Sequence, residues 1–111
     1  MFTVSTDREP RSISSSLQYE RKPKPLLLII DDEEQLNRTL TLHLEREYLV
    51  RSATSGPEGL AAAEKLKPTA VLLDQHLPGM GGMEVLEKLQ RLTPSPLVVI
   101  MTAYGEVRSA V

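Results

Sequence analysis

The sequence predicts an α/β fold in which a parallel sheet carries helices on both faces. Short, continuous apolar runs such as LLLII alternate along the chain with longer segments whose apolar residues recur at helical spacing. Continuous apolar runs are typical of strands buried on both faces, and a regular alternation of strands and helices is typical of parallel sheets. The pattern predicts the order β-α-β-α-β-α-β-α from residue 26 to residue 111.

The four predicted strands are bounded by changes in apolar content and by proline. They are expected at residues 26–30, 48–54, 69–74 and 97–101. The helices are expected between and after them, at residues 33–48, 57–67, 83–92 and 102–111.

Each helix has a signal of its own. The first repeats leucine every four residues at Leu36, Leu40 and Leu44, which is an amphipathic pattern. Ser55 or Gly56 can cap the second helix, and a proline follows in its first turn. The third is expected to bury three apolar side chains, those of Val85, Leu86 and Leu89.

Composition excludes several classes of function. The chain has 111 residues, of which 41% are apolar and 25% charged, as in ordinary globular domains. A formal charge of −2 gives no broad basic surface for nucleic acid or anionic membranes. The absence of cysteine excludes disulfides and Cys-ligated metal, and no apolar run approaches the roughly 20 residues of a membrane span. A cytoplasmic protein fits these features.

Residues 1–25 differ from the rest of the chain. They are rich in Ser, Arg, Lys and Pro and have no sustained apolar period, so we expect a disordered leader before a domain at 26–111. The basic end at 21–25 could bind an acidic partner, but a solvated leader is the favoured interpretation.

Acidic residues gather where the strands end. Asp31 and Asp32 follow the first strand, Asp74 ends the third, and Thr102 follows the fourth. Parallel strands end at one edge of a sheet, where open α/β sheets place their sites. With the first strand beside the third and the third beside the fourth, strands about 4.8 Å apart would bring these side chains within several ångströms.

Three clustered carboxylates repel one another. For a pair at ~4 Å the repulsion is about 4 kcal/mol at an effective dielectric constant of 20. Raised pKa values or a bound cation would relieve this, and Mg²⁺ suits a site with few carboxylates and implies a substrate that carries phosphate. Asp74, which precedes a Pro-Gly loop, has the position of an exposed reactive carboxylate. Glu33 and Glu34 are more simply explained as the acidic start of a helix.

At these residues the sequence resembles the receiver domain of two-component response regulators. The likeness covers residues 26–111 and is carried by LLIIDDEEQL, AVLLDQHLPGMGGMEVL and PLVVIMTAYGEVRSAV. The segment MTAYGEVRSAV, residues 101–111, is most similar to receivers of the nitrogen-regulation type. The resemblance implies a three-layer, flavodoxin-like sheet of order 2-1-3-4, to which the family adds a fifth strand and helix.

The resemblance also implies roles for individual residues. Asp74 would accept a phosphoryl group from a sensor histidine kinase, as a carboxylate is a competent nucleophile. Asp32 would ligate Mg²⁺ directly, Asp31 mainly through water, and the backbone carbonyl of His76 would complete the protein ligands. We expect no chemical role for the side chains of His76 and His43.

Two further residues would contact the phosphoryl group. Thr102 would hydrogen-bond a phosphoryl oxygen and carry the switch, and Ala103 would leave room for the group and offer its N–H. The chain departs from the family pattern after that, because the fifth strand, its lysine and the fifth helix are missing. Gly81 stands where the family often has Asp, but can still cap the third helix.

The expectation is therefore a partial receiver domain from a longer transcriptional regulator, with Mg²⁺ as cofactor and no enzyme activity beyond self-catalysed phosphoryl transfer. The edge of its fourth strand would be exposed and could mediate self-association. A second possibility is a protein-binding module that cannot switch. A phosphatase of the haloacid-dehalogenase type fits poorly, because that class needs Asp-x-Asp where this chain has Asp74-Gln75-His76.

Overall fold

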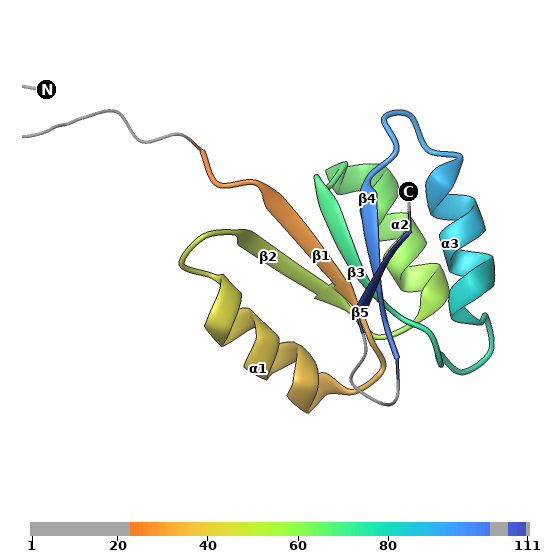
Figure 1. The fold of residues 1–111 in the computed structure, drawn as a ribbon, viewed down its shortest axis with the longest axis horizontal. Helices are drawn as coiled ribbons and strands as arrows, with labels where there is room; N and C mark the ends of the chain where they lie inside the picture. Colours follow the sequence, from red (N-terminus) through yellow and green to blue (C-terminus); the bar gives the residue numbers. More distant parts are fainter. Residues whose placement is uncertain (1–22, 103–106, 111) are drawn as a thin grey trace, which may run out of the picture.

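The computed structural model describes residues 23–102 and 107–110, which form one mixed sheet flanked by helices (Figure 1). The strands, in spatial order, are β2 (Leu49–Ala53), β1 (Leu26–Ile30), β3 (Ala70–Asp74), β4 (Leu97–Met101) and β5 (Val107–Ala110). The helices within this part of the chain are α1 (Glu34–Leu44), α2 (Gly56–Leu66) and α3 (Gly82–Gln90). No helix among the described residues is long and apolar enough to span a membrane.

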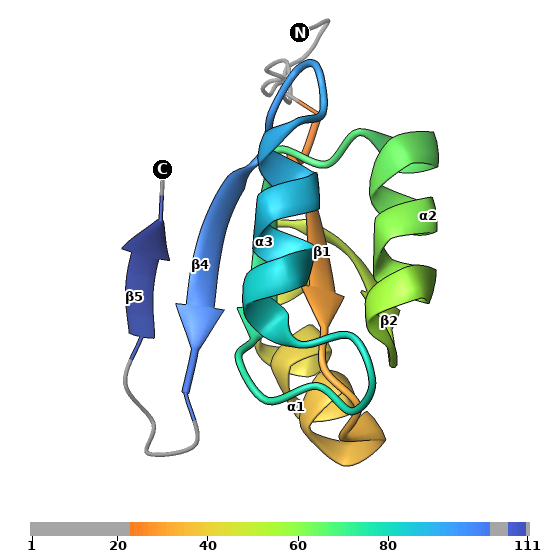
Figure 2. The same ribbon diagram turned by 90° about the vertical axis from the view of Figure 1, so that its right-hand side faces the viewer.

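The first four strands are parallel, and their helices cover both faces of the sheet. Helix α1 lies on one face, while α2 and α3 lie side by side on the other (Figures 1 and 2). The predicted three-layer architecture and the order 2-1-3-4 are therefore confirmed. Residues 1–22 of the expected leader lie outside the described part of the chain, and 23–25 are exposed and belong to no helix or strand.

The core lies between the sheet and the pair α2 and α3. Alternate residues of β1, β3 and β4 face these helices and meet the three apolar side chains predicted for α3. The fully buried members of this cluster are Leu28, Ile30, Val71, Leu73, Val85, Leu89 and Val98. Burial of each such side chain is worth about 1.5–3 kcal/mol. Gly59 lets α2 approach β1 closely, since a Cβ at this position would lie 2.5 Å from Cδ1 of Ile30.

Local signals place α2 as predicted. Ser55 is the N-cap residue, and its Oγ accepts the N–H of Glu58 at 3.2 Å. The carboxylate of Glu58 in turn accepts the N–H of Thr54 at 3.0 Å, which satisfies a second backbone donor near the helix start. The C-cap of the helix is Lys67, whose left-handed φ of 50° turns the chain toward the buried Pro68.

The α1 face of the sheet is covered less completely. The predicted leucine stripe, Leu36, Leu40 and Leu44, is only partly buried, and the buried residue of this helix is Asn37. On β4, Leu97 lies on this face and is 43% exposed. Part of the apolar surface on this side is therefore exposed in the described part of the chain.

The prediction of a helix at 102–111 is wrong for residues 107–110. Residues 107–110 form strand β5, which pairs antiparallel with β4 so that Val98 faces Ala110 and Met101 faces Val107. Residues 103–106 and 111 lie outside the described part. Pairing satisfies backbone groups that β4 would otherwise leave open at the edge of the sheet, and this non-local gain outweighs local helical spacing.

Two related expectations change with β5. The sheet has a fifth strand, although it is antiparallel, and the β4 edge is covered from Val98 to Met101. The predicted route of self-association through an exposed β4 edge therefore loses its basis. The tetrapeptide VRSA of β5 also occupies residues 50–53 in β2, at the opposite edge of the sheet.

Candidate functional site

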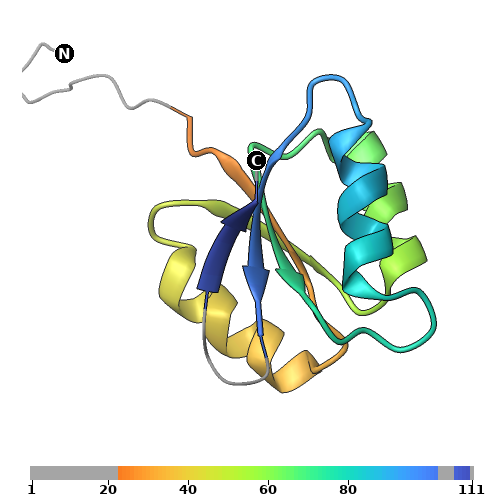
Figure 3. The same cartoon turned by 45° about the vertical axis from the view of Figure 1, so that its right-hand side comes forward.

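The acidic residues predicted from the sequence meet at the carboxyl edge of the sheet. The arrowheads of β1, β3 and β4 point to this edge (Figures 2 and 3). Asp31, Asp32 and Asp74 each offer one carboxylate oxygen, and these oxygens lie within 4.8 Å of one another. The parallel topology alone brings them together, because the residues that follow neighbouring strands must be neighbours in space.

Asp31 is the deepest of the three acids. It is 4% exposed, its N–H donates to the carbonyl of Ala53 at 3.1 Å, and its Oδ1 accepts the N–H of Glu33 at 2.9 Å. Burial raises the pKa of the Asp31 carboxyl, and the charges of Asp74, Asp32 and Glu33 raise it further, while the hydrogen bond from Glu33 opposes the shift. The site therefore favours either a proton on Asp31 or a nearby cation.

Asp32 and Asp74 face solvent more openly. Asp32 is exposed and Asp74 is half-buried. One oxygen of Asp74, Oδ1, accepts the N–H of His76 at 3.1 Å, which orients the carboxylate at the end of β3. The next residue, Gln75, donates its N–H to the carbonyl of Met101 at 3.0 Å, so the strand end is held against β4.

The loop after β3 is tied closely to the site. Gly79 has a left-handed φ of 76°, and Gly81 is the N-cap of α3, as predicted. Gly82 donates to the carbonyl of Gln75, and a Cβ at Gly82 would lie 2.7 Å from the carbonyl oxygen of Asp74. The start of α3 thus packs directly on the backbone that carries Asp74, a constraint that the sequence analysis missed.

The acids border an open depression of about 570 Å³. Its lining combines the ends of β1, β3 and β4 with the start of α1, and comprises Asp31, Asp32, Glu33, Leu36, Asp74, His76, Met101 and Thr102. Thr102 is thus where the sequence analysis expected it, while Ala103 lies outside the described residues. Three carboxylates beside an open volume form a donor set of the kind that holds a hard divalent cation such as Mg²⁺.

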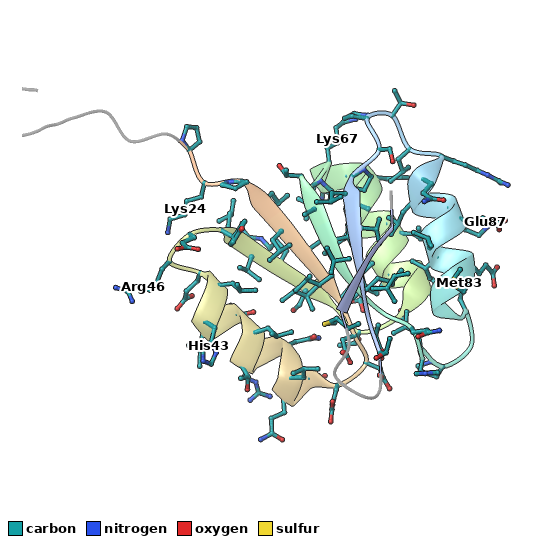
Figure 4. The ribbon with its side chains drawn as sticks, viewed as in Figure 1. Lys24, His43, Arg46, Lys67, Met83 and Glu87 are labelled. Atoms are coloured by element: carbon teal, nitrogen blue, oxygen red, sulfur yellow. The ribbon has the colours of Figure 1, made fainter. Side chains whose placement is uncertain are left out.

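Neither histidine belongs to the group of side chains, Asp31, Asp32 and Asp74, that could hold a metal ion among the described residues. His43 projects from the outer side of α1, away from the sheet (Figure 4), and its Nδ1 lies 2.8 Å from the carbonyl of Thr39. The side chain of His76 is exposed, as predicted.

The burial of one residue near the site, Asn37, was not predicted. Asn37 is 4% exposed, and its Nδ2 donates to the backbone carbonyl of Asp31 at 2.9 Å. The signal for its burial was in the helical spacing, because Leu40, Thr41 and Leu44 follow it at the intervals of one helix face.

The fold and the site together define a class of protein. Its members are doubly wound α/β domains that carry, at the carboxyl edge of the sheet, a cluster of acidic residues able to hold a cation. The chain belongs to the response regulator receiver domain family, whose model matches residues 27–111. It is therefore a receiver domain of the two-component type, and receiver domains are phosphorylated by sensor histidine kinases.

Relatives by sequence include transcriptional regulators and a phosphotransferase. The chain is 42% identical over 82 residues to an uncharacterized transcriptional regulatory protein, YkoG, of Bacillus subtilis (strain 168), covering 73% of this chain and 36% of the relative. It is 37% identical over 82 residues to sporulation initiation phosphotransferase F of the same organism, covering 73% of this chain and 66% of the relative. The chain therefore spans less than two thirds of both.

Solved structures agree in fold. A CheY-like response regulator receiver domain protein from Methanospirillum hungatei JF-1 has a TM-score of 0.69 and 34% sequence identity, with 75% of this chain and 67% of that one covered. The N-terminal domain of a receiver protein from Methanoculleus marisnigri JR1 has a TM-score of 0.67 and 32% identity, with 71% and 67% covered.

Proposed function

We propose that Asp74 is the phosphoacceptor of this receiver domain and that Asp31, Asp32 and Asp74 together hold Mg²⁺. The observation that carries the proposal is the convergence of the three carboxylates within 4.8 Å beside an open depression. Asp74 is the acid at the end of the central strand β3, and it is half-exposed, so a phosphoryl donor can reach it.

The three acids have different environments and therefore different proposed roles. The exposed Asp32 is free to ligate the ion directly. Asp31 already accepts the N–H of Glu33, so it acts mainly by holding a water of the ion. The backbone carbonyl of His76 is the proposed third protein ligand. A bound Mg²⁺ would neutralise charge on the phosphoryl oxygens during transfer.

The proposed step is a displacement at phosphorus. A carboxylate oxygen of Asp74 forms the new O–P bond as the bond from phosphorus to the donor breaks, and the donor leaves with that electron pair. The hydrogen bond from the His76 N–H to Oδ1 leaves Oδ2 of Asp74 as the attacking atom. Thr102, which borders the depression, is proposed to contact a phosphoryl oxygen, and Ala103 is proposed to leave space for the group.

The proposed partner is a sensor histidine kinase, and the proposed setting is the cytoplasm. Output through transcription is supported by relatives that are themselves transcriptional regulatory proteins. A resemblance of residues 101–111 to receivers of the nitrogen-regulation type stays a prediction.

The test is phosphorylation by a small-molecule phosphodonor in the presence of Mg²⁺, followed by mass spectrometry of the intact chain and its peptides. We expect one phosphoryl group on Asp74, lost on treatment with hydroxylamine, as for an acyl phosphate. Asp74→Asn should remove it, and Glu84→Gln, an exposed acid on α3, should leave it unchanged. A label that survives Asp74→Asn would contradict the proposal. Mg²⁺ binding without any label would favour a protein-binding module that does not switch.

A further inference from the structure

The geometry points to a positioning role for Asn37. We propose that its side-chain amide fixes the backbone between Asp31 and Asp32 in the orientation at which the acidic cluster binds Mg²⁺. This inference rests on the proposed function, because it concerns the affinity of the same site for its ion.

Asn37 occupies a place where an apolar side chain would be expected. It is the buried residue of α1, at 4% exposure, whereas Leu36, Leu40 and Leu44 of that helix are only partly buried. Burial of an amide is unfavourable unless its polar atoms are paired. Its location therefore needs a reason beyond packing.

The bond that Asn37 makes is directed at the acid pair. Its Nδ2 donates to the carbonyl oxygen of Asp31 at 2.9 Å, in a buried hydrogen bond that joins α1 to the end of β1. The N–H of Asp31 is held by Ala53 on β2, and its carboxylate by Glu33. Asn37 supplies the remaining constraint, because the direction of the Asp31 carbonyl sets ψ of Asp31 and so determines where the chain places Asp32.

The other half of the amide makes no such contact. Oδ1 of Asn37 is buried and accepts no hydrogen bond from the described residues. Turning the amide over would not help, because Oδ1 would then face the Asp31 carbonyl, and two acceptors repel. The amide is thus satisfied on one side only, which is an unfavourable arrangement for stability and is consistent with a role at the site.

Loss of the hydrogen bond from Asn37 to Asp31 should affect Mg²⁺ affinity more than the stability of the fold. Asp32 is exposed, so its position relative to Asp31 and Asp74 depends on the backbone that carries it. Replacing a residue that orients metal ligands through hydrogen bonds typically changes the metal affinity 10–100-fold. Replacing Asn37 by leucine, which is similar in size and apolar, removes the bond to Asp31 and the unpaired Oδ1 together. The carbonyl of Asp31 loses its donor, but the buried and unpaired Oδ1 of Asn37 is removed as well, so the two effects on the stability of the metal-free fold should largely offset each other.

The experiment compares Mg²⁺ binding with metal-free stability. Mg²⁺ dissociation constants are measured by calorimetric titration, and thermal midpoints are measured in EDTA, for the wild-type chain, Asn37→Leu and Asn37→Ser. Thr41→Val is the matched control, since Oγ1 of Thr41 bonds the carbonyl of Asn37 in the same helix but does not touch Asp31. We expect both Asn37 variants to bind Mg²⁺ at least about tenfold more weakly, with midpoints in EDTA no lower than that of Thr41→Val. We expect Thr41→Val to bind Mg²⁺ like the wild type.

The possible failures are distinguishable. If the wild type and both Asn37 variants bind Mg²⁺ equally, the role of Asn37 is wrong and the proposed function stands. If Thr41→Val weakens binding as much, the effect is a general loosening of α1 and the inference fails. If neither Asn37 variant folds in EDTA, the bond serves the fold alone, and the inference is again overturned. Absence of Mg²⁺ binding by the wild type would overturn both this inference and the proposed Mg²⁺-dependent function.

Discussion

Replacing Asp74 by asparagine should stabilise the protein when Mg²⁺ is absent. The carboxylate oxygens of Asp31, Asp32 and Asp74 lie within 4.8 Å of one another, so Asp74 takes part in two like-charge pairs. A pair at ~4.8 Å repels by about 0.9 kcal/mol in water and by about 3.5 kcal/mol at an effective dielectric constant of 20. Asp32 is exposed and Asp74 half-buried, which places the net gain near the lower figures, at about 1–3 kcal/mol.

The substitution removes charge and little else. Asparagine has almost the same volume, and its Oδ1 can still accept the N–H of His76, a bond that measures 3.1 Å. Urea unfolding at neutral pH in EDTA measures the change directly. In thermal unfolding each kcal/mol should raise the midpoint by about 4–8 °C for a domain of this size.

Adding Mg²⁺ should reduce or reverse the difference between the two proteins. A ligand at 100 times its dissociation constant stabilises the folded state by about 2.7 kcal/mol, and the wild type should gain this at lower Mg²⁺ concentrations than the variant. Glu87→Gln is the control, because Glu87 projects from the outer side of α3 (Figure 4). Lower stability of Asp74→Asn in EDTA, or an equal rise for Glu87→Gln, would refute the electrostatic reasoning.

Three further predictions concern pH, packing and capping. The pKa of Asp31 is raised by its burial and by the acids around it, so the folded state holds this proton more tightly than the unfolded state. Its contribution to stability is present below the unfolded pKa, near about 4, and is lost as pH rises through the folded pKa. In EDTA, the free energy of unfolding should therefore fall with rising pH in the wild type relative to Asp31→Asn; a difference that does not depend on pH would contradict this. Gly82→Ala should lower the free energy of unfolding in urea by about 1–3 kcal/mol and reduce phosphodonor labelling, because the new Cβ would lie 2.7 Å from the backbone carbonyl oxygen of Asp74. Gly81→Ala is the control and should lose far less stability, because a Cβ at this position has nothing within 4 Å. Ser55→Ala should lower the urea stability by about 1 kcal/mol through loss of the α2 cap, and an unchanged midpoint would show that the cap contributes nothing.

Most of the fold could be predicted because its signals are local. The apolar runs at 26–30 and 97–101 coincide with β1 and β4 residue for residue, since short continuous apolar runs are typical of strands in a parallel sheet. The clustering of the three acids could be predicted from those strands, because the residues that follow neighbouring parallel strands lie side by side. Proline and glycine marked the start of α2 and the loop before α3.

The parts that could not be predicted depend on contacts distant in sequence. Residues 107–110 are a strand because β4 offers an unpaired edge, a fact that no window around those residues contains. The helical spacing of α1 places Asn37 on its buried face, but the partner that an amide finds there, the backbone carbonyl of Asp31, is not visible in a side-chain pattern. Gly82 likewise owes its importance to the backbone of Asp74 and Gln75, not to its own loop.

The antiparallel direction of β5 decides where the described chain enters and leaves the domain. Ala110 lies opposite Val98 near the beginning of β4, and Pro23 precedes the beginning of β1, so both points lie at the amino edge of the sheet (Figure 1). The acids lie at the other edge, about 17 Å away along a five-residue strand. Fluorophores or fusion partners attached at these two points would therefore leave the depression open. A change at Asp74 would have to act over the length of the strands to reach either point.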